Sequence, residues 1–362
     1  MSTSHSSQYG LTAAQREVFD HLLAVGAARP LTPPTLASEL TATLETGCSA
    51  ALSRWPETRL WLSKSHISNI LRCEGSALAQ AADRDSTYSG AIAVGVVSHK
   101  AIQISHTHRH LTPAAAVDAA VEASRDDVKF SLWWDDQSAG VQSDLLCQMV
   151  SRTVGFLDAF PPLPPNWVPR FEESIQARLG KLVLSTRPDL VLGRPRVDMR
   201  QTMFLCDFKS GSLNDQHLLE ARFYALVSTL RFGVAPFRST VFSVASGEWT
   251  DPDISADVLR ETAETVVSAV NNYIDVMLDR RDPVYTPDRW CMWCPARQDC
   301  AAATEHQASL QSGPVQSGRQ AVQPVVVLGR KPSSSATKTP TNSTSAAKKK
   351  KTTAPKNVFD IE

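Results

Sequence analysis

The composition lacks the features that would assign this chain to a class at once. Its 37 Lys and Arg residues balance 37 Asp and Glu residues, so no overall positive field attracts nucleic acid, and any such binding must come from local patches. No apolar run reaches the roughly 18 residues that a membrane helix needs. The N-terminus has neither a basic start nor an apolar segment, so we expect no secretory signal and a cytoplasmic protein.

The sequence also lacks the glycine-rich GxxxxGK[ST] phosphate loop, which excludes a helicase motor in this chain. Its 7 cysteines come without an export signal, so we expect reduced thiols, metal ligands or core packing in place of disulfides. In contrast, 42% of the residues are hydrophobic, which is enough for a substantial core. The length of 362 residues allows one large domain or two ordinary ones.

Helical patterns dominate the first half of the chain. Apolar side chains recur at helical spacing, and prolines mark the start of the second segment. Ser65 is the predicted N-cap of the third helix. The predicted helices cover residues 11–28, 32–55, 63–80, 112–124 and 142–160, and an apolar stretch containing Gly95 and His99 covers residues 91–104.

Strand-like runs, bounded by Gly and Pro, follow in the second half. The predicted strands lie within residues 170–179, 181–193 and 202–208, and a helix at 215–229, a strand at 239–244 and a long amphipathic helix at 254–278 come after them. This order of elements predicts an α/β fold with a mixed sheet flanked by helices.

We expect three regions along the chain. Residues 1–62 form an N-terminal helical region, residues 63–303 form the main domain, and residues 304–362 form a tail. The tail is rich in Ser, Thr, Pro and Lys and has no apolar period, so it is predicted to be disordered. Its Lys348–Lys351 run would add weak affinity for phosphates or would serve only solubility.

Two acids and a lysine stand out among the predicted strands. In "FLCDFKSG", Asp207 and Lys209 are two residues apart, so they share one face of an otherwise apolar strand. Alone, this pair indicates no more than a salt bridge. If the strand that begins at Asp189 forms a hairpin with it, two carboxylates lie close together and repel. A divalent cation such as Mg²⁺ would relieve that repulsion, and Lys209 would hold or activate an attacking water.

This pattern resembles the PD-(D/E)-x-K nuclease superfamily, with Pro188-Asp189 and Asp207-x-Lys209 as its two motifs. The resemblance implies a restriction-endonuclease-like fold. It also implies that Asp189 and Asp207 ligate a metal ion and that Lys209 is the catalytic lysine.

Further residues resemble the RecB-like branch of that superfamily. Gly95-x-x-x-His99 matches an upstream motif whose histidine ligates metal, although a satisfied histidine on a helix surface would look the same. Glu220 and Tyr224 match a helix that usually reads Gln-x-x-x-Tyr, with Glu220 in place of the Gln. The resemblance implies catalytic roles for both, while a core-facing aromatic explains Tyr224 equally well.

Two other groups of residues offer alternatives. His106, His108 and His110 alternate in "HTHRH" and would present three imidazoles on one face of a strand, although an exposed turn is the plainer explanation. Trp133 and Trp134 would suit stacking on bases, although core positions are again plainer.

Three cysteines lie close together as Cys291-x2-Cys294-x5-Cys300, a spacing that core packing does not explain. A site with four thiolates needs one more ligand. The candidates are Cys48, Cys73, Cys147 and Cys206. Of these, Cys206 should face the sheet side opposite Asp207, and Cys48 and Cys147 read as small buried side chains in helices.

The context of Cys73, with the trio that follows, resembles the iron–sulfur members of the RecB-like branch. The resemblance implies a [4Fe–4S] cluster bound by Cys73, Cys291, Cys294 and Cys300, which would clasp the N-terminal helices to the C-terminal end of the domain. Glu74 stands where that group usually has Pro. The similarity covers residues 63–303 and is greatest to CRISPR-associated exonucleases of the Cas-four type and to the nuclease domains of AddAB-type helicase-nucleases.

The resemblance implies a metal-dependent DNA exonuclease or end-processing nuclease that uses Mg²⁺ or Mn²⁺ and acts on single-stranded DNA or DNA ends. Its partners would belong to CRISPR adaptation, recombination or phage replication. The alternative is a non-catalytic nucleic-acid-binding or adaptor protein that keeps the fold, against which the intact Asp189, Asp207 and Lys209 argue. A third hypothesis is a zinc-stabilised binding module whose acids are structural.

Overall fold

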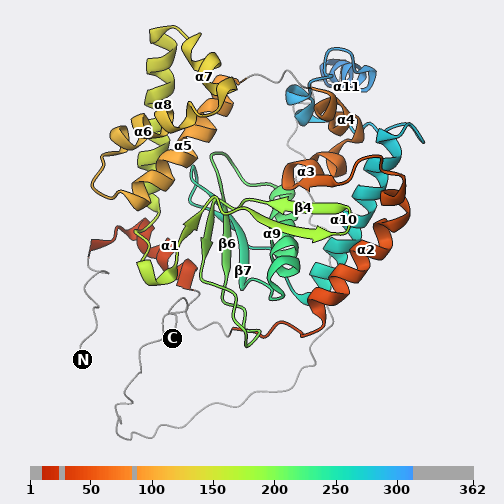
Figure 1. Ribbon diagram of the computed structural model, residues 1–362. Helices are drawn as coiled ribbons and strands as arrows, with labels where there is room; N and C mark the ends of the chain where they lie inside the picture. Colours follow the sequence, from red (N-terminus) through yellow and green to blue (C-terminus); the bar gives the residue numbers. More distant parts are fainter. Residues whose placement is uncertain (1–9, 24–28, 84–87, 313–362) are drawn as a thin grey trace, which may run out of the picture.

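Two β-sheets form the centre of the protein, as the computed structural model in Figure 1 shows, and the structure describes residues 10–23, 29–83 and 88–312. The smaller sheet has the order β1-β4-β3, with strands Leu60–Ser63, Leu182–Thr186 and Ile175–Leu179. The larger sheet has the order β2-β5-β6-β7-β8, with strands Arg170–Phe171, Leu190–Leu192, Phe204–Lys209, Arg238–Ser243 and Trp249–Thr250.

Strand pairing in the larger sheet confirms the predicted hairpin. β5 runs antiparallel to β6, with Leu190 opposite Cys206. β6 then pairs in parallel with β7, and the connection between them is helix α9 (Asp215–Phe232), as a parallel pair requires. The sheet is therefore mixed, and the predicted α/β class with flanking helices is confirmed.

Helices α2 (Leu36–Arg54) and α10 (Ala256–Met277) lie side by side on one flank of the molecule (Figure 1). Their apolar faces meet α9 and the smaller sheet in the largest hydrophobic core, in which Leu40, Leu44 and Ile274 are fully buried. A second core joins α1 (Ala13–Leu23) and the end of α8 (Ala139–Ala159) to the larger sheet.

A separate layer of helices stands on the other side of the larger sheet (Figure 1). It consists of α5 (Gly90–Thr107), α6 (Pro113–Ser124), α7 (Val128–Asp135) and α8 (Ala139–Ala159). This layer has its own core, centred on small residues of α5 and α6 and on Phe130 and Met149. The layer places one face of α5 opposite the strands that carry the acidic residues.

The structure corrects the helix predicted over residues 63–80. The segment forms two helices, α3 (Lys64–Arg72) and α4 (Glu74–Ala82), which meet at an extended Cys73 with φ −164°. The N-cap is Ser63 and not Ser65, because the Ser63 hydroxyl accepts the hydrogen bond from the His66 amide. Strand β1 runs directly into this cap, a change of element that the helical pattern concealed.

Other differences are local. Strand β1 and helix α7 were not predicted. The described part of the first predicted helix is α1 (Ala13–Leu23), and its residues 24–28 lie outside the described residues. Helix α11 (Ala301–Ser312) ends the described chain, and residues 313–362, which make up most of the predicted tail, lie outside it. None of the described helices has the length and apolar character that crossing a bilayer requires.

Candidate metal-dependent active site and cysteine cavity

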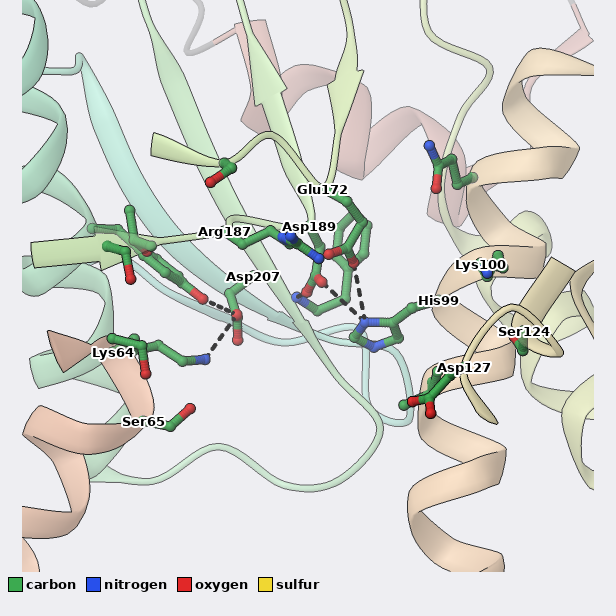
Figure 2. A pocket seen from close by; sticks show the side chains of 18 of the residues that line it. Lys64, Ser65, His99, Lys100, Ser124, Asp127, Glu172, Arg187, Asp189 and Asp207 are labelled. Carbon is green, nitrogen blue, oxygen red and sulfur yellow. Dashed lines mark hydrogen bonds and ion pairs between the residues drawn. The ribbon is translucent and has the colours of Figure 1, made fainter. Parts of the chain in front are cut away.

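A cleft of about 1100 Å³ separates the helical layer from the strands, and the sequence-predicted acids face it. Figure 2 shows His99 reaching into the cleft from α5, while Lys64 and Ser65 approach from α3 on the opposite side. Asp189, just before β5, and Asp207, within β6, lie between them. The cleft therefore brings together parts of the chain that are far apart in sequence.

Asp189 immediately precedes β5 and is almost fully buried. One of its carboxylate oxygens, Oδ2, accepts a hydrogen bond from the backbone N–H of Phe208 in the paired strand. The other, Oδ1, lies 2.9 Å from Nδ1 of His99. The β5–β6 hairpin thus fixes the Asp189 carboxylate and aims one oxygen at α5.

Glu172 completes a cluster that the sequence analysis missed. Ligand atoms of His99, Glu172 and Asp189 all lie within 4.8 Å of one another. Glu172 directly follows the short strand β2, and its φ of 52° is a left-handed conformation that costs energy for a non-glycine residue. The pairing of β2 with β5 explains why this glutamate arrives beside Asp189.

The charges of this cluster are strongly coupled. Burial, together with the neighbouring Asp189 carboxylate, raises the pKa of Glu172 to about 7. Burial opposes protonation of His99, but the carboxylates of Asp189 and Glu172 outweigh it and raise the pKa of the imidazole. Such mutual perturbation in a cleft is typical of functional sites. Two carboxylates and an imidazole also form a donor set that suits Mg²⁺ or Mn²⁺.

Asp207 lies on β6 beside this cluster and is bound by two lysines. Its Oδ2 is 2.7 Å from Nζ of Lys209, and its Oδ1 is 3.2 Å from Nζ of Lys64. Tyr224 of α9 donates its hydroxyl hydrogen to the same Oδ1. Burial alone would raise the pKa of Asp207, but the two ammonium groups hold it well below the usual range.

Glu220, one turn before Tyr224 on α9, shares both lysines with Asp207. Its Oε2 lies 2.9 Å from Nζ of Lys209 and 3.2 Å from Nζ of Lys64. Two buried acids and two lysines therefore form a closed group of balanced charge. The structure thus places Glu220 and Tyr224 next to the predicted catalytic pair.

Lys64 is the second residue that the sequence analysis missed. It is the first residue of α3, and its side chain is only 19% exposed. Its ammonium also lies 5.2 Å from the centre of the Tyr224 ring. Nothing in the sequence indicated that Lys64 would contact a strand 143 residues away.

The alternative prediction, in which three histidines share one face of a strand, is wrong, because this segment does not form a strand. His106 belongs to the last turn of α5, and its ring packs among the rings of Phe156, Phe160 and Phe171. His108 is the C-cap of that helix, and it and His110 are exposed. The three imidazoles therefore do not share one face.

The tryptophans of α7 belong to the helical layer. Trp134 is buried against Phe130, and Trp133 packs at the edge of the same core. Neither residue lines the large cleft. The plainer of the two explanations offered by the sequence therefore holds for Trp134.

Four of the seven cysteines line a second, smaller cavity. Cys73, at the junction of α3 and α4, faces Cys291, Cys294 and Cys300 from the segment after α10. Cys48 and Cys206 are buried in helix and strand as predicted, but Cys147 is exposed, contrary to the prediction. Within the described chain, the cysteines do not form a group as tight as the His99 cluster. A mononuclear zinc site would draw four sulfurs to about 3.8 Å from one another, given Zn–S bonds of about 2.3 Å.

Polar contacts join the same two segments beside the cysteines. Glu74 accepts hydrogen bonds from both terminal nitrogens of Arg281, each at 2.7 Å, and from the backbone N–H of Val284. The backbone N–H of Glu74 donates in turn to the carbonyl of Val284. Glu74, which stands where the iron–sulfur members of the RecB-like branch usually have Pro, therefore connects α4 to the C-terminal segment.

Comparison with known proteins gives one match to a family. The model of the PD-(D/E)XK nuclease superfamily matches residues 61–301, more than half of the 362-residue chain. No curated protein matches the chain. Among solved structures, the crystal structure of SSO0001 aligns with 72% of this chain and 95% of its own, at 12% sequence identity and a TM-score of 0.28. At that TM-score and identity, we infer neither fold nor function from this similarity.

Proposed function

The chain belongs to the PD-(D/E)XK nuclease superfamily, and on this premise we propose that it is a metal-dependent DNA exonuclease or end-processing nuclease. The observation that carries the proposal is the gathering of His99, Glu172 and Asp189 within 4.8 Å of one another, next to the Asp207–Lys209 pair. Single-stranded DNA or a DNA end is the proposed substrate.

The donor set fits a divalent cation. His99, Glu172 and Asp189 would hold it, with Asp207 as the neighbouring carboxylate. A bound Mg²⁺ or Mn²⁺ would supply Lewis acidity toward the phosphodiester and lower the pKa of an attached water. Lys209 is paired with two carboxylates and is therefore a fixed cation in the cleft, where it would hold the attacking water and stabilise negative charge on the phosphate.

The supporting residues act on the position of these groups. The hydroxyl of Tyr224 and the ammonium of Lys64 hold Oδ1 of Asp207, so the carboxylate has a defined orientation. The carboxylate of Glu220 holds Lys209 from the other side. The backbone N–H of Phe208 donates a hydrogen bond to Oδ2 of Asp189 and so fixes the orientation of that carboxylate. Asp189, Asp207 and Lys209 are thus each oriented by at least one buried neighbour.

The test is a nuclease assay on end-labelled single- and double-stranded DNA with Mg²⁺, with Mn²⁺ and with EDTA. We expect cleavage that EDTA abolishes and that Asp189→Asn and Asp207→Asn each reduce by at least about a hundredfold, because each variant removes a charge where a cation binds. Asp198→Asn is the matched control, since Asp198 is exposed and forms ion pairs with the exposed Arg196 and Arg200. A wild-type protein that binds DNA but cleaves none of these substrates would favour the non-catalytic alternative.

We also propose that Cys73, Cys291, Cys294 and Cys300 bind a [4Fe–4S] cluster that clasps the two ends of the domain. The observation that supports this proposal is that all four thiols line one cavity between the two ends of the domain. A cluster bound there would cross-link the two segments, which would couple metal binding to folding.

Anaerobic purification followed by visible absorbance and iron analysis tests the cluster. We expect a brown protein with about four iron atoms per chain. Cys73→Ala should bleach the colour and lower the iron content, whereas Cys147→Ala should change neither, because Cys147 is exposed and lies outside the cavity. Colourless protein that carries zinc would rule out the iron–sulfur proposal.

A further inference from the structure

A third cavity, of about 230 Å³, lies behind His99 and is distinct from the large cleft. It opens between α5, α8 and the ends of β6 and β7. His99 lines both this cavity and the cleft, so the two spaces meet at the proposed metal ligand. The remaining lining residues are Gly95, Ser98, Ile102, Ser151, Arg152, Gly155, Ser210, Val244 and Ala245.

Ser98 lines this cavity, and its hydroxyl is buried without a partner among the described residues. The residue is only 3% exposed, and its Oγ has no hydrogen-bond partner among the described residues. Buried hydroxyls elsewhere in these helices behave differently, because Ser105 and Thr153 each donate to the carbonyl four residues earlier. A buried hydroxyl without a partner is costly, so a ligand that accepts its hydrogen would be stabilised here.

Arg152 lines the same cavity and carries an uncompensated charge. The residue is half-buried, and its guanidinium has no ion pair or hydrogen bond with any residue that the structure describes. No acidic residue belongs to the described lining of the cavity. A guanidinium in such surroundings favours an oxyanion, and its planar array of donors fits a phosphate group.

Two glycines keep the cavity open. A Cβ atom added at Gly95 of α5 or at Gly155 of α8 would meet nothing within 4 Å. Glycine lowers helix stability relative to alanine, and close packing explains neither position. Ser151 and Ser210 add further hydroxyls to the wall.

We propose that this cavity is a phosphate-binding subsite. In it, Arg152 and Ser98 bind one phosphate of the nucleic acid, while the adjacent phosphodiester linkage of the same strand lies at the metal ligands. The inference rests on the proposed nuclease function and extends it. The phosphate is either the monoester at a strand end or the next diester along the strand. Both are oxyanions, and the guanidinium and the hydroxyl would recognise either.

Nucleotide binding in EDTA tests the subsite without any cleavage. The probes are thymidine 5′-monophosphate, thymidine 3′-monophosphate and thymidine, titrated calorimetrically into the full chain. We expect at least one monophosphate to bind, thymidine not to bind, and Arg152→Met to weaken binding by about tenfold or more, through the loss of a charge-assisted hydrogen bond. Arg178→Met is the matched control, because Arg178 is exposed on β3 and lines neither cavity.

Ser98→Ala provides a second variant that should fold normally, since the hydroxyl that it removes makes no hydrogen bond in the protein. It should weaken monophosphate binding while leaving the melting temperature unchanged or higher. If neither Arg152→Met nor Ser98→Ala weakens binding, or if the wild-type chain binds no monophosphate, the proposal is wrong.

Cleavage of oligonucleotides that differ only at their ends identifies the source of the phosphate. If Arg152→Met cleaves only the substrates with one phosphorylated end more slowly than the wild type does, the bound phosphate is the monoester at that end. If it cleaves all substrates more slowly to the same extent, the bound phosphate is the diester. Unchanged cleavage of every substrate contradicts the proposal. If the wild-type chain cleaves DNA but binds no monophosphate, the result contradicts the subsite proposal and leaves the nuclease proposal intact. If it binds a monophosphate but cleaves no DNA, the result contradicts the nuclease proposal and not phosphate binding in the cavity.

Discussion

At the scale of single residues, the site is an arrangement of charges that balance one another. Asp207 and Glu220 are buried carboxylates, and each is within 3.2 Å of both Lys64 and Lys209. Any cation that approaches Asp207 must therefore compete with two ammonium groups. Lys64 makes the longer contacts of the two lysines, so it is the easier one to displace.

Replacement of Lys64 should therefore change metal affinity. In Lys64→Met, we expect Mn²⁺ to bind about tenfold more tightly, because a competing charge close to Asp207 and Glu220 is removed, a Coulomb effect of roughly 1–4 kcal/mol at such distances. Calorimetric titration of Mn²⁺ measures this change. Lys64→Arg, which keeps the charge, should bind Mn²⁺ as the wild type does. Weaker binding in Lys64→Met would contradict this prediction and would mean that the orienting contact of Lys64 with Asp207 outweighs its competition with the cation.

At the scale of elements, helix α3 connects the two candidate sites. Lys64 begins the helix at the acidic cleft, and Cys73, its C-cap, lies at the cysteine cavity. Its nine residues span roughly 13 Å at 1.5 Å per residue. The position of Lys64 therefore depends on how α3 and α4 are fastened to the C-terminal segment, and Glu74 provides that fastening independently of the cysteines.

Loss of the Glu74 contacts should destabilise the protein. Glu74→Gln replaces a carboxylate that accepts three hydrogen bonds, two of them from Arg281, and we expect a free energy of unfolding about 1.5–3 kcal/mol lower. Urea unfolding at pH 7 measures this difference, with the exposed Glu45→Gln as control.

The effect of Glu74 should also depend on pH. Hydrogen bonds from Arg281 lower the pKa of Glu74 below its ordinary value of 4.5. The carboxylate therefore stabilises the folded state above about pH 4.5, and this contribution is lost as the pH falls through the lower folded pKa. The difference between wild type and Glu74→Gln should accordingly shrink in acid. A difference that is constant with pH would argue against a charged contact.

At the scale of the whole molecule, the cleft lies between two bodies of packed helices. One is the layer α5–α8, with its own core, and the other is built from α2, α3, α9 and α10 around the smaller sheet. In the second body, α2 contributes Leu36, Leu40 and Leu44, each at most 1% exposed, to the core that supports α9. The N-terminal region therefore packs directly beneath the element that carries Glu220 and Tyr224.

A chain that begins at residue 63 should consequently not fold on its own. It would lose α2 and most of strand β1, and it would expose apolar surface of α9 and α10. Circular dichroism and urea unfolding of the shortened chain test this expectation. A shortened chain with a cooperative transition like that of the full chain would contradict the prediction.

In the full chain, Leu40→Ala should lower the free energy of unfolding by about 2–5 kcal/mol, and the exposed Ser49→Ala should have little effect.

The sequence by itself determined the local part of this site. Asp207 and Lys209 share a strand face because side chains alternate along a strand, and Asp189 joins them because adjacent apolar runs form a hairpin. The three clustered cysteines and the α/β class followed from spacing and element order in the same way. These features depend on residues that are close in the chain, where periodicity is informative.

Only the tertiary structure revealed two of the distant residues that complete the site. Glu172 follows a strand of two residues, too short to show alternation, and Lys64 reaches Asp207 from an element 143 residues away. The unpartnered Ser98 and the unpaired Arg152 belong to different helices, whose packing alone creates the cavity between them. Local patterns specify which face of an element is buried, but the partner that covers that face is set by the packing of the whole chain.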